Sequence, residues 1–349
     1  MSFYYRLPAA LIAATIAIVQ PEFAVAQLSA QQVEKIPRNE GNPSGAIDYN
    51  EAIRLNPNDA NAYYNRAKAR SDQGDIEGAI ADYNEAIRLN PSYAQAYKNR
   101  GNARYEQKDL QGAIADYNEA IRLNPNDAEA YNYRGVVRSD QGDIQGASAD
   151  HNESIRLNPS DAQAYYNRGV FRSDQGDIQG AIADYNEAIR LNPNDAEAYT
   201  NRGVVRSDQG DKQGASADYN EAIRLDPNFA PAYINRGIVR SDQGDIQGAS
   251  ADYNEAIRLN PSYAEAYNHR GAFRYYQGDL QGAIADYNEA IRLDPNHADA
   301  YNNRALVRSD QEDKQGAIND FQKASELYQQ QGNTDSYRDA QNAIRELQK

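Results

Sequence analysis

Apolar and polar residues alternate along this chain with the spacing of amphipathic helices, and the same alternation returns at a fixed interval. The stretch 178–191, IQGAIADYNEAIRL, places its apolar residues at helical spacing and ends just before a proline. Stretches of this kind precede eight prolines at a constant step of 34 residues: Pro57, Pro91, Pro125, Pro159, Pro193, Pro227, Pro261 and Pro295. Such a period is typical of repeat architectures, in which each unit packs only against its neighbours. The sequence therefore predicts one elongated array of repeats.

Each repeat contains two predicted helices of about fourteen residues, separated by a short break. In the repeat 162–195 a first helix, the A helix, runs to the break Gln175-Gly176-Asp177. Gly ends this helix, Asp caps the next one, and the B helix then continues until Pro193 stops it. We expect the Asn or Ser after each proline to be the N-cap of the following A helix: Asn58, Ser92, Asn126, Ser160, Asn194, Asn228, Ser262 and Asn296. A Gln or Glu three residues later would complete a capping box in five repeats: Gln95, Glu129, Gln163, Glu197 and Glu265.

These signals divide the chain into four parts. Residues 1–26 combine Arg6 with an apolar run over 7–19 and small residues at Ala24 and Ala26, which is the pattern of a signal peptide for export. The apolar run is too short for a membrane span of about twenty residues, so we expect cleavage after Ala26. Residues 27–59 form an N-terminal segment with a degenerate half-repeat, residues 60–331 hold eight repeats, and residues 332–349 form a C-terminal capping helix.

The repeat resembles the tetratricopeptide repeat (TPR), whose signature is W-x2-L-G-x2-Y, then A-x3-F, then P. The corresponding residues in the repeat 162–195 are Tyr165, Arg168, Gly169, Arg172, Ala181, Tyr185 and Pro193. The resemblance covers about four fifths of the chain. It implies an all-α fold, a right-handed superhelical solenoid of helix hairpins, and a non-enzymatic role in binding other proteins.

Two arginines depart from this signature, because they occupy places where the family has Leu and Tyr. Arg168 and Arg172 share the A-helix face that should pack against a neighbour, and a buried unpaired guanidinium would cost several kcal/mol. Each B helix offers an Asp at a constant place, so we predict bidentate ion pairs across each hairpin. The central repeats give the pairs Arg168 with Asp184, Arg202 with Asp218, and Arg236 with Asp252. The second arginine should pack its stem and keep its head in solvent.

The composition of the chain argues against catalytic, metal and cofactor sites. The chain has no cysteine, and its three histidines occupy different places in their repeats, so we predict neither a metal site nor a cofactor site. No catalytic or phosphate-binding motif is present, so no residue is assigned a catalytic role. The net charge of −15 disfavours nucleic acid and anionic membranes as partners. His151 stands where most repeats have Tyr, and the repeat 128–161 should therefore open first, more easily at acidic pH.

A second face of the A helix is the candidate binding surface. Positions 6, 9 and 13 of the repeat lie opposite the arginines, on the face that lines the concave groove in TPR proteins. The predicted peptide-binding residues are Asn99, Asn167, Asn201 and Asn235 at position 6, Val170, Val204 and Ile238 at position 9, and Asp174, Asp208 and Asp242 at position 13. Asparagine can grip a peptide backbone, because its amide donates and accepts hydrogen bonds. Alternatively, these asparagines bond neighbouring helices.

The partner predicted from this surface is a neutral or basic extended polypeptide segment. The acidic row would repel the carboxylate tails that some TPR co-chaperones hold, and the clamp residues of those proteins are incomplete here. We expect the protein to be exported to a periplasm or beyond the cell, without stable membrane insertion after cleavage. Two alternatives stay open: a self-associating envelope protein, and a carbohydrate-binding or polysaccharide-export accessory that uses Tyr64, Tyr105, Tyr166, Tyr275 and Tyr276.

Overall fold

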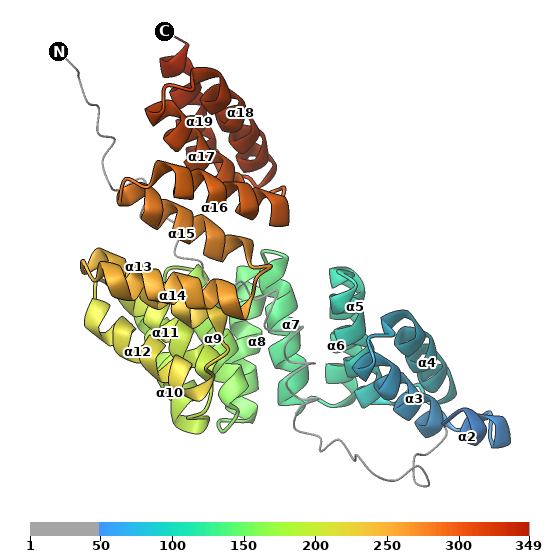
Figure 1. Ribbon diagram of the computed structural model, residues 1–349. Helices are drawn as coiled ribbons and strands as arrows, with labels where there is room; N and C mark the ends of the chain where they lie inside the picture. Colours follow the sequence, from blue (N-terminus) through green and yellow to red (C-terminus); the bar gives the residue numbers. More distant parts are fainter. Residues whose placement is uncertain (1–48, 349) are drawn as a thin grey trace. The chain divides into compact units, whose positions relative to one another are not determined.

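The computed structural model describes residues 49–348 of the chain, and within this range it contains 18 α-helices and no strand. The all-α class and the consecutive helix hairpins predicted from the sequence are confirmed (Figure 1). The predicted signal peptide and residues 27–48 of the predicted N-terminal segment lie outside the described residues. The described residues fall into two compact units, 49–194 and 195–348.

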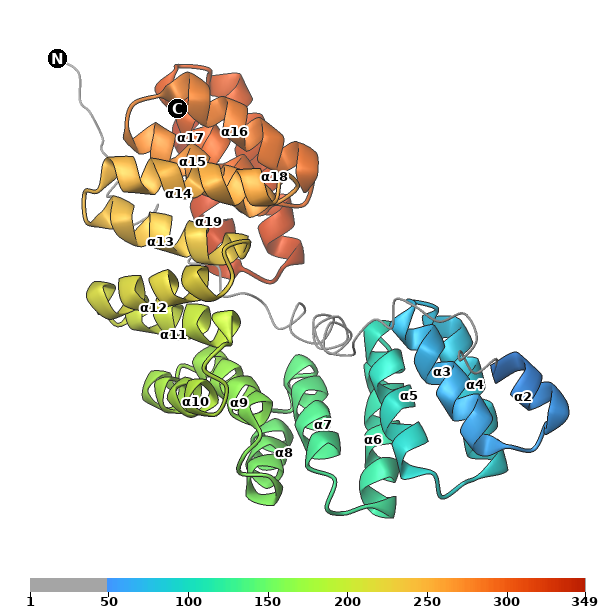
Figure 2. The same cartoon turned by 60° about the horizontal axis from the view of Figure 1, so that its bottom comes forward.

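The N-terminal unit consists of one half-repeat and four hairpins. Its A helices are α3 (Ala60–Asp72), α5 (Ala94–Glu106), α7 (Ala128–Asp140) and α9 (Ala162–Asp174). Its B helices are α2 (Tyr49–Leu55), α4 (Ile76–Leu89), α6 (Leu110–Leu123), α8 (Ile144–Leu157) and α10 (Ile178–Leu191). Each A helix packs most closely on the B helix that follows it, as the paired ribbons of α5 and α6 show (Figure 2). The short helix α2 is the end of the predicted half-repeat and packs on α3.

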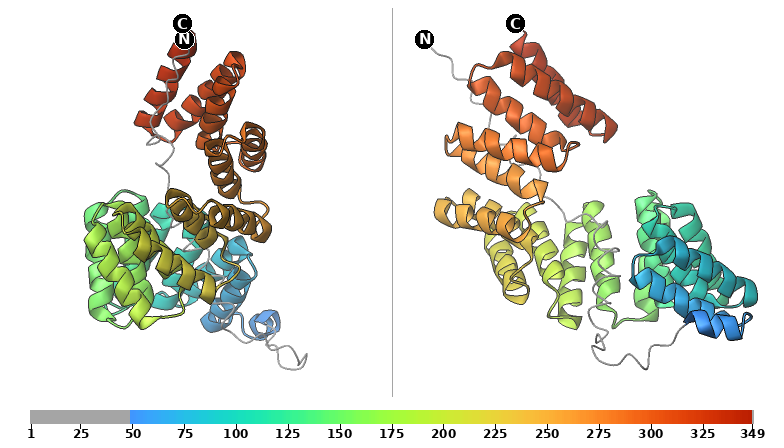
Figure 3. Two further views of the ribbon diagram at one scale, coloured as in Figure 1. Left: turned by 60° about the vertical axis from the view of Figure 1, so that its left-hand side comes forward. Right: turned by 45° about the vertical axis from the view of Figure 1, so that its right-hand side comes forward.

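The C-terminal unit consists of four hairpins and a terminal helix. Its A helices are α11 (Ala196–Asp208), α13 (Ala230–Asp242), α15 (Ala264–Tyr276) and α17 (Ala298–Asp310). Its B helices are α12 (Lys212–Leu225), α14 (Ile246–Leu259), α16 (Leu280–Leu293) and α18 (Lys314–Gln330), and α19 (Thr334–Leu347) follows. Ala340 and Ile344 of α19 are buried against Phe321 and Leu327 of α18, so α19 covers the last hairpin (Figure 3).

The core of each hairpin is made of small residues and one large ring, which is a tyrosine in six hairpins, His151 in α8 and Phe321 in α18. Tyr185 is buried between α9 and α10, and a Cβ added at Gly169 would lie 2.9 Å from its ring carbon Cε1. Glycine at this place therefore lets the two helices approach around the ring. Alanine takes the same place in the first and last repeats, at Ala67 and Ala305, and both alanines are fully buried.

The predicted N-caps of the A helices are wrong by one residue. Asn58 does not cap α3; it lies in a turn, with its N–H donating to Asn56 Oδ1 at 3.3 Å, and the cap is Asp59, which accepts from Asn61 N. The Asx turn after each B helix takes up the residue that follows the proline, so the A helix starts one place later. The predicted capping boxes do not form, and where Tyr93, Phe229, Tyr263 or His297 takes the cap position no side chain caps the helix.

The turn between the A and B helices agrees with its prediction. Gly176 has a positive φ of 75° after α9, and Asp177 caps α10 by accepting from Gly180 N at 3.0 Å. Lys108 and Glu312 take the glycine position in two repeats, both with φ of 63°. No helix of the described part of the chain has the length and apolar character that crossing a membrane needs.

Candidate functional site

The first arginine of each repeat forms a two-pronged ion pair with the buried aspartate of its own hairpin. Arg168 donates from Nε to Asp184 Oδ2 at 2.8 Å and from Nη2 to Asp184 Oδ1 at 2.7 Å. Asp184 is only 3% exposed, so its charge depends on this contact. The same geometry occurs in all eight repeats: Arg66 with Asp82, Arg100 with Asp116, Arg134 with Asp150, Arg168 with Asp184, Arg202 with Asp218, Arg236 with Asp252, Arg270 with Asp286, and Arg304 with Asp320.

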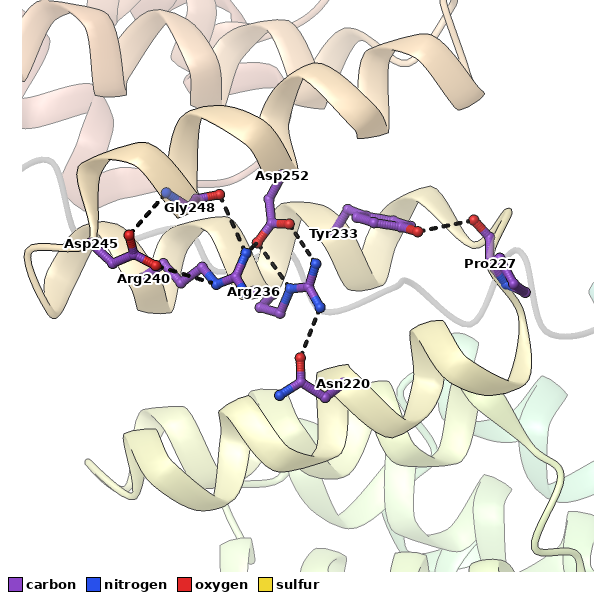
Figure 4. A network of polar contacts seen from close by, with 8 residues as sticks. All are labelled: Asn220, Pro227, Tyr233, Arg236, Arg240, Asp245, Gly248 and Asp252. Atoms are coloured by element: carbon purple, nitrogen blue, oxygen red, sulfur yellow. Dashed lines mark hydrogen bonds and ion pairs between the residues drawn. The ribbon is translucent and has the colours of Figure 1, made fainter.

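The second arginine binds the same carboxylate, which differs from the solvent-facing head expected from the sequence. In the repeat drawn in Figure 4, Arg240 Nη1 donates to Asp252 Oδ2 at 2.9 Å and to the carbonyl of Gly248 at 3.4 Å. Its Nε also lies 3.6 Å from the cap residue Asp245. One carboxylate can accept several hydrogen bonds, so a single aspartate holds both guanidinium groups of the hairpin.

The Nη1 nitrogen of the first arginine, which does not contact the aspartate, joins one repeat to the next. Arg236 donates from Nη1 to Asn220 of the preceding B helix at 2.8 Å, and its Cζ lies 5.4 Å from the ring centre of Tyr233 (Figure 4). Both outer nitrogens and Nε of Arg236 therefore have protein partners. The repeat arginines thus form a series of contacts within and between hairpins, the polar ladder, and their donors point to protein groups rather than to an open anion-binding surface, as the ion-pair hypothesis requires.

The position-6 asparagines do not lie on an open surface, contrary to the predicted backbone-gripping row. Asn167, Asn201 and Asn235 are only 6%, 3% and 3% exposed. Asn167 donates to Asn132 Oδ1 of the preceding A helix at 3.2 Å and accepts from Gln163 Nε2 at 2.9 Å. In the same way Asn99 donates to the hydroxyl of Tyr64 at 3.0 Å. Asn167 and Asn99 thus connect successive A helices, which is the structural alternative considered from the sequence.

The position-9 residues are also mostly covered by neighbouring helices. Val170 and Val204 are 7% and 2% exposed, and Ile238 is half-buried against Ile234 and its neighbours. A helical wheel predicts which way a residue points but not what covers it; in the C-terminal unit Val204 of α11 packs in one cluster with Val239 of the next A helix, α13.

The position-13 aspartates are the predicted binding residues that remain exposed. Asp174, Asp208 and Asp242 are the last residues of α9, α11 and α13, and all three are exposed. Partial burial raises the pKa of the Asp174 carboxyl, and the charge of Asp140 adds to this effect. Partial burial also raises the pKa of Asp208. Asp242 differs, because Lys212 Nζ lies 2.9 Å from its Oδ2.

Comparison with protein families gives the repeat its identity. Models described as tetratricopeptide repeat match residues 64–128, 116–147, 196–229 and 298–331. A model described as TPR repeat matches residues 44–74, 172–210, 239–275 and 273–312. Together the matches extend over more than half of the chain. The chain belongs to the tetratricopeptide repeat family.

Solved structures show the same fold at low sequence identity. The TPR array is similar to the hetero-tetramer of Cut9 and Hcn1 from the APC/C, with 16% identity, a TM-score of 0.62, and coverage of 86% of this chain and 58% of that one. It is also similar to a TPR protein from Parabacteroides merdae, with 20% identity, a TM-score of 0.58, and coverage of 71% and 98%. For PilF of Pseudomonas aeruginosa the identity is 17%, the TM-score 0.53, and the coverage 59% and 94%. No curated protein sequence matches the chain.

Two of the three histidines of this TPR array meet at a buried glutamate, which the sequence analysis missed. His269 Nε2 and His297 Nε2 lie 3.2 Å and 2.7 Å from the two carboxylate oxygens of Glu265. The two histidines occupy different repeat positions, so repeat spacing alone gives no signal for this contact. Within residues 49–348 no group of three His, Asp or Glu side chains is arranged to hold a metal ion.

The tyrosines that would serve a carbohydrate site are spread over the array and differ in exposure. Tyr105 and Tyr166 are 6% and 3% exposed, whereas Tyr276 is 69% exposed. Tyr105 donates its hydroxyl to Asp140 at 2.6 Å, and Tyr275 donates to Asp310 at 2.5 Å. A stacking platform for sugars needs several exposed rings together, and these side chains provide one exposed ring.

Proposed function

We propose that this TPR array is a non-enzymatic scaffold that binds an extended neutral or basic polypeptide segment, with the acidic ends of its A helices facing the partner. TPR arrays are consistent with protein–protein interaction scaffolds, and family membership supports this class of function. The main support for a neutral or basic partner is the row of aspartates at position 13. These side chains are exposed, whereas the asparagines at position 6 and the valines at position 9 are used in packing between helices.

The placement of these aspartates conflicts with helix electrostatics. Asp174 and Asp208 stand at the C-terminal ends of their helices, where the helix dipole disfavours a negative charge by a few tenths of a kcal/mol up to about 1 kcal/mol. Among residues 49–348 no lysine or arginine forms an ion pair with either side chain. A local cost that is retained at the same place in two successive repeats is expected where function requires it. Lysine or arginine side chains of a bound segment would offset the charge.

The experiment that tests this proposal compares two charge-matched variants of the full chain. The first changes Asp174, Asp208 and Asp242 to Asn. The control changes Glu187, Glu221 and Glu255 of the B helices to Gln; these side chains are about one third exposed and pair with arginines of their own helices. Binding of labelled, unstructured peptides of equal length that are lysine-rich, neutral or glutamate-rich would be measured by fluorescence anisotropy at physiological salt. We expect the lysine-rich peptide to bind and the Asp variant to bind it at least several-fold more weakly than the control variant does. Equal loss in both variants would mean unspecific attraction to an acidic protein, and the proposal would fail.

Export is part of the proposal and has its own test. The three-part pattern of residues 1–26 supports cleavage after Ala26 and a location in a periplasm or outside the cell. Sequencing the N-terminus of the mature protein from fractionated cells should give Gln27 as the first residue. An intact N-terminus in the cytoplasmic fraction would contradict export.

A further inference from the structure

The contact between His297 and Glu265 has a counterpart in the N-terminal unit. In the N-terminal unit Tyr93, the N-cap residue of α5, donates its hydroxyl to Asn61 Oδ1 in the first turn of α3 at 3.0 Å. In the C-terminal unit His297, the N-cap residue of α17, places Nε2 2.7 Å from Glu265 Oε2 in the first turn of α15. Each contact joins the starts of two successive A helices. The first pair is neutral, and the second consists of groups that titrate.

The groups around His297 favour its protonated form. Its ring is largely buried, with a side-chain exposure of 9%, and Nε2 has no aligned hydrogen-bond partner. Burial lowers the pKa of His297, but the contact with Glu265 and the charges of Asp299 and Asp294 outweigh this effect and raise the pKa above its ordinary value of 6.5. Asp299 also accepts a hydrogen bond from Tyr328 of α18 at 2.5 Å.

Glu265 is held in its charged form by the same contacts. Burial raises the pKa of its carboxyl, but the hydrogen bonds and charges of His269 and His297 outweigh burial and keep the pKa well below its usual range. His269 approaches from one turn further along α15, where six other repeats have Asn. The largely buried carboxylate therefore lies between two imidazoles, and loss of the His297 proton would remove the positive charge that faces it.

We propose that Glu265, His269 and His297 form a proton-operated latch that fastens the start of α17 to the start of α15. Protonation closes the latch by pairing the imidazolium of His297 with the Glu265 carboxylate. Deprotonation opens it, because a neutral His297 ring no longer compensates the Glu265 carboxylate or the charges of Asp294 and Asp299 that act on the ring. Since the proton is bound more tightly in the folded chain, the stabilisation is fully present below pH 6.5 and is lost as the pH rises through the raised pKa.

The direct test is the titration of the histidine rings in the full chain labelled with 15N-histidine. The chain has three histidines, so three ring signals are expected and can be assigned with single His→Gln variants. His297 should titrate above pH 6.5 in the wild-type chain, and Glu265→Gln should move its midpoint down. A midpoint at or below the ordinary value, unchanged in Glu265→Gln, would overturn the proposal even if other variants fold poorly.

Hydrogen exchange tests whether the proton fastens the helices. Protection factors of amides in the first turn of α17 should fall several-fold between about pH 6 and about pH 9 in the wild type and stay nearly constant in His297→Gln, whose amide cannot titrate. Tyr93→Phe provides the matched control, since removing the neutral contact should lower protection at the start of α5 equally at both pH values. The same pH profile in wild type and His297→Gln would contradict the latch.

Discussion

At the scale of single residues, the array shows how two guanidinium groups are accommodated at a helix interface. Asp184 supplies three acceptor contacts to Arg168 and Arg172, and each bond lies between 2.7 and 2.8 Å. The ring of Tyr165 lies 5.6 Å from the Cζ of Arg168. The arginines thus replace hydrophobic signature residues without leaving a buried charge unpaired.

Replacing both partners of this ion pair should cost less than the sum of the two single replacements. Asp184→Ala leaves two arginines without their carboxylate, and we expect a loss of about 3–5 kcal/mol in the free energy of unfolding. The double variant Arg168→Ala, Asp184→Ala should lose less free energy of unfolding than the sum of the two single variants. In the double variant neither Arg168 nor Asp184 is left as a charge without its partner. Urea denaturation of the four proteins measures the cycle. Strict additivity would show that the pair does not interact energetically.

His151 should make the stability of the N-terminal unit depend on pH in the acidic range. Its ring is 1% exposed, and neither its Nδ1 nor the hydroxyl of Ser154 one turn later has a hydrogen-bond partner. Burial lowers the pKa of His151 to about 3, and the charge of Arg168 contributes. The unfolded chain takes up a proton near pH 6.5, whereas the folded chain resists it.

Stability of the repeat 128–161 should therefore be intact above pH 6.5 and decline as the pH falls toward 3, by at most about 1.4 kcal/mol per pH unit. Hydrogen exchange of α8 at about pH 7 and about pH 5 measures this decline. His151→Tyr restores the residue of the sister repeats and should remove the pH dependence specific to α8. Equal acid sensitivity in the variant would assign the effect to other groups.

At the scale of the helix and its turn, backbone conformation decides where glycine is needed. Gly278 has φ of 83° and open space around the position of a Cβ, so only the backbone requires glycine there. Glu312 takes the equivalent place after α17 with φ of 63°, a conformation that costs a non-glycine residue about 1 kcal/mol.

Replacing Glu312 by Gly should stabilise the C-terminal unit by up to about 1 kcal/mol, because the strain is relieved without loss of packing. Thermal denaturation followed by circular dichroism measures the gain. Gly278→Ala is the matched control and should destabilise by a similar amount. If Glu312→Gly left the thermal stability unchanged or lowered it, the contacts of the glutamate side chain would stabilise the fold by at least as much as its backbone conformation costs.

The elements themselves were predictable, because the same apolar pattern and turn residues return eight times. The N-cap was misplaced because Asn58 and Asp59 are adjacent and both suit a cap, and the turn that separates them depends on the preceding helix. The burial of Asn167 depends on how closely α9 stacks on the preceding A helix, α7, and helical periodicity contains no information about this stacking. The meeting of His297 with Glu265 also follows from that stacking alone.

At the scale of the whole molecule, each unit is built from interchangeable contacts between repeats. Within the C-terminal unit Arg236 donates to Asn220, Arg270 to Asn254 and Arg304 to Asn288, with distances of 2.8, 2.8 and 2.6 Å. Any A helix carrying this arginine can therefore dock on any B helix carrying this asparagine. The end of the unit is different, because α19 lacks the arginine and covers Phe321, Leu327 and Tyr328 with apolar side chains.

Deleting one internal repeat should consequently be tolerated, whereas deleting the last helix should not. Removal of residues 230–263 brings Arg270 to Asn220, which has the same chemistry as its present partner Asn254. We expect this variant to fold as a monomer, with a urea m-value reduced in proportion to the surface of one repeat.

Removal of residues 332–349 retains the arginine contacts of all eight repeats but exposes the apolar side chains that α19 covers. Light scattering should then show concentration-dependent association. Comparing the two deletions separates two contributions to stability: the repeated polar contacts between hairpins and the apolar contacts of the terminal helix. If the internal deletion aggregated while the end deletion stayed monomeric, the repeats would not be interchangeable, and the polar ladder would not set the docking of one hairpin on the next.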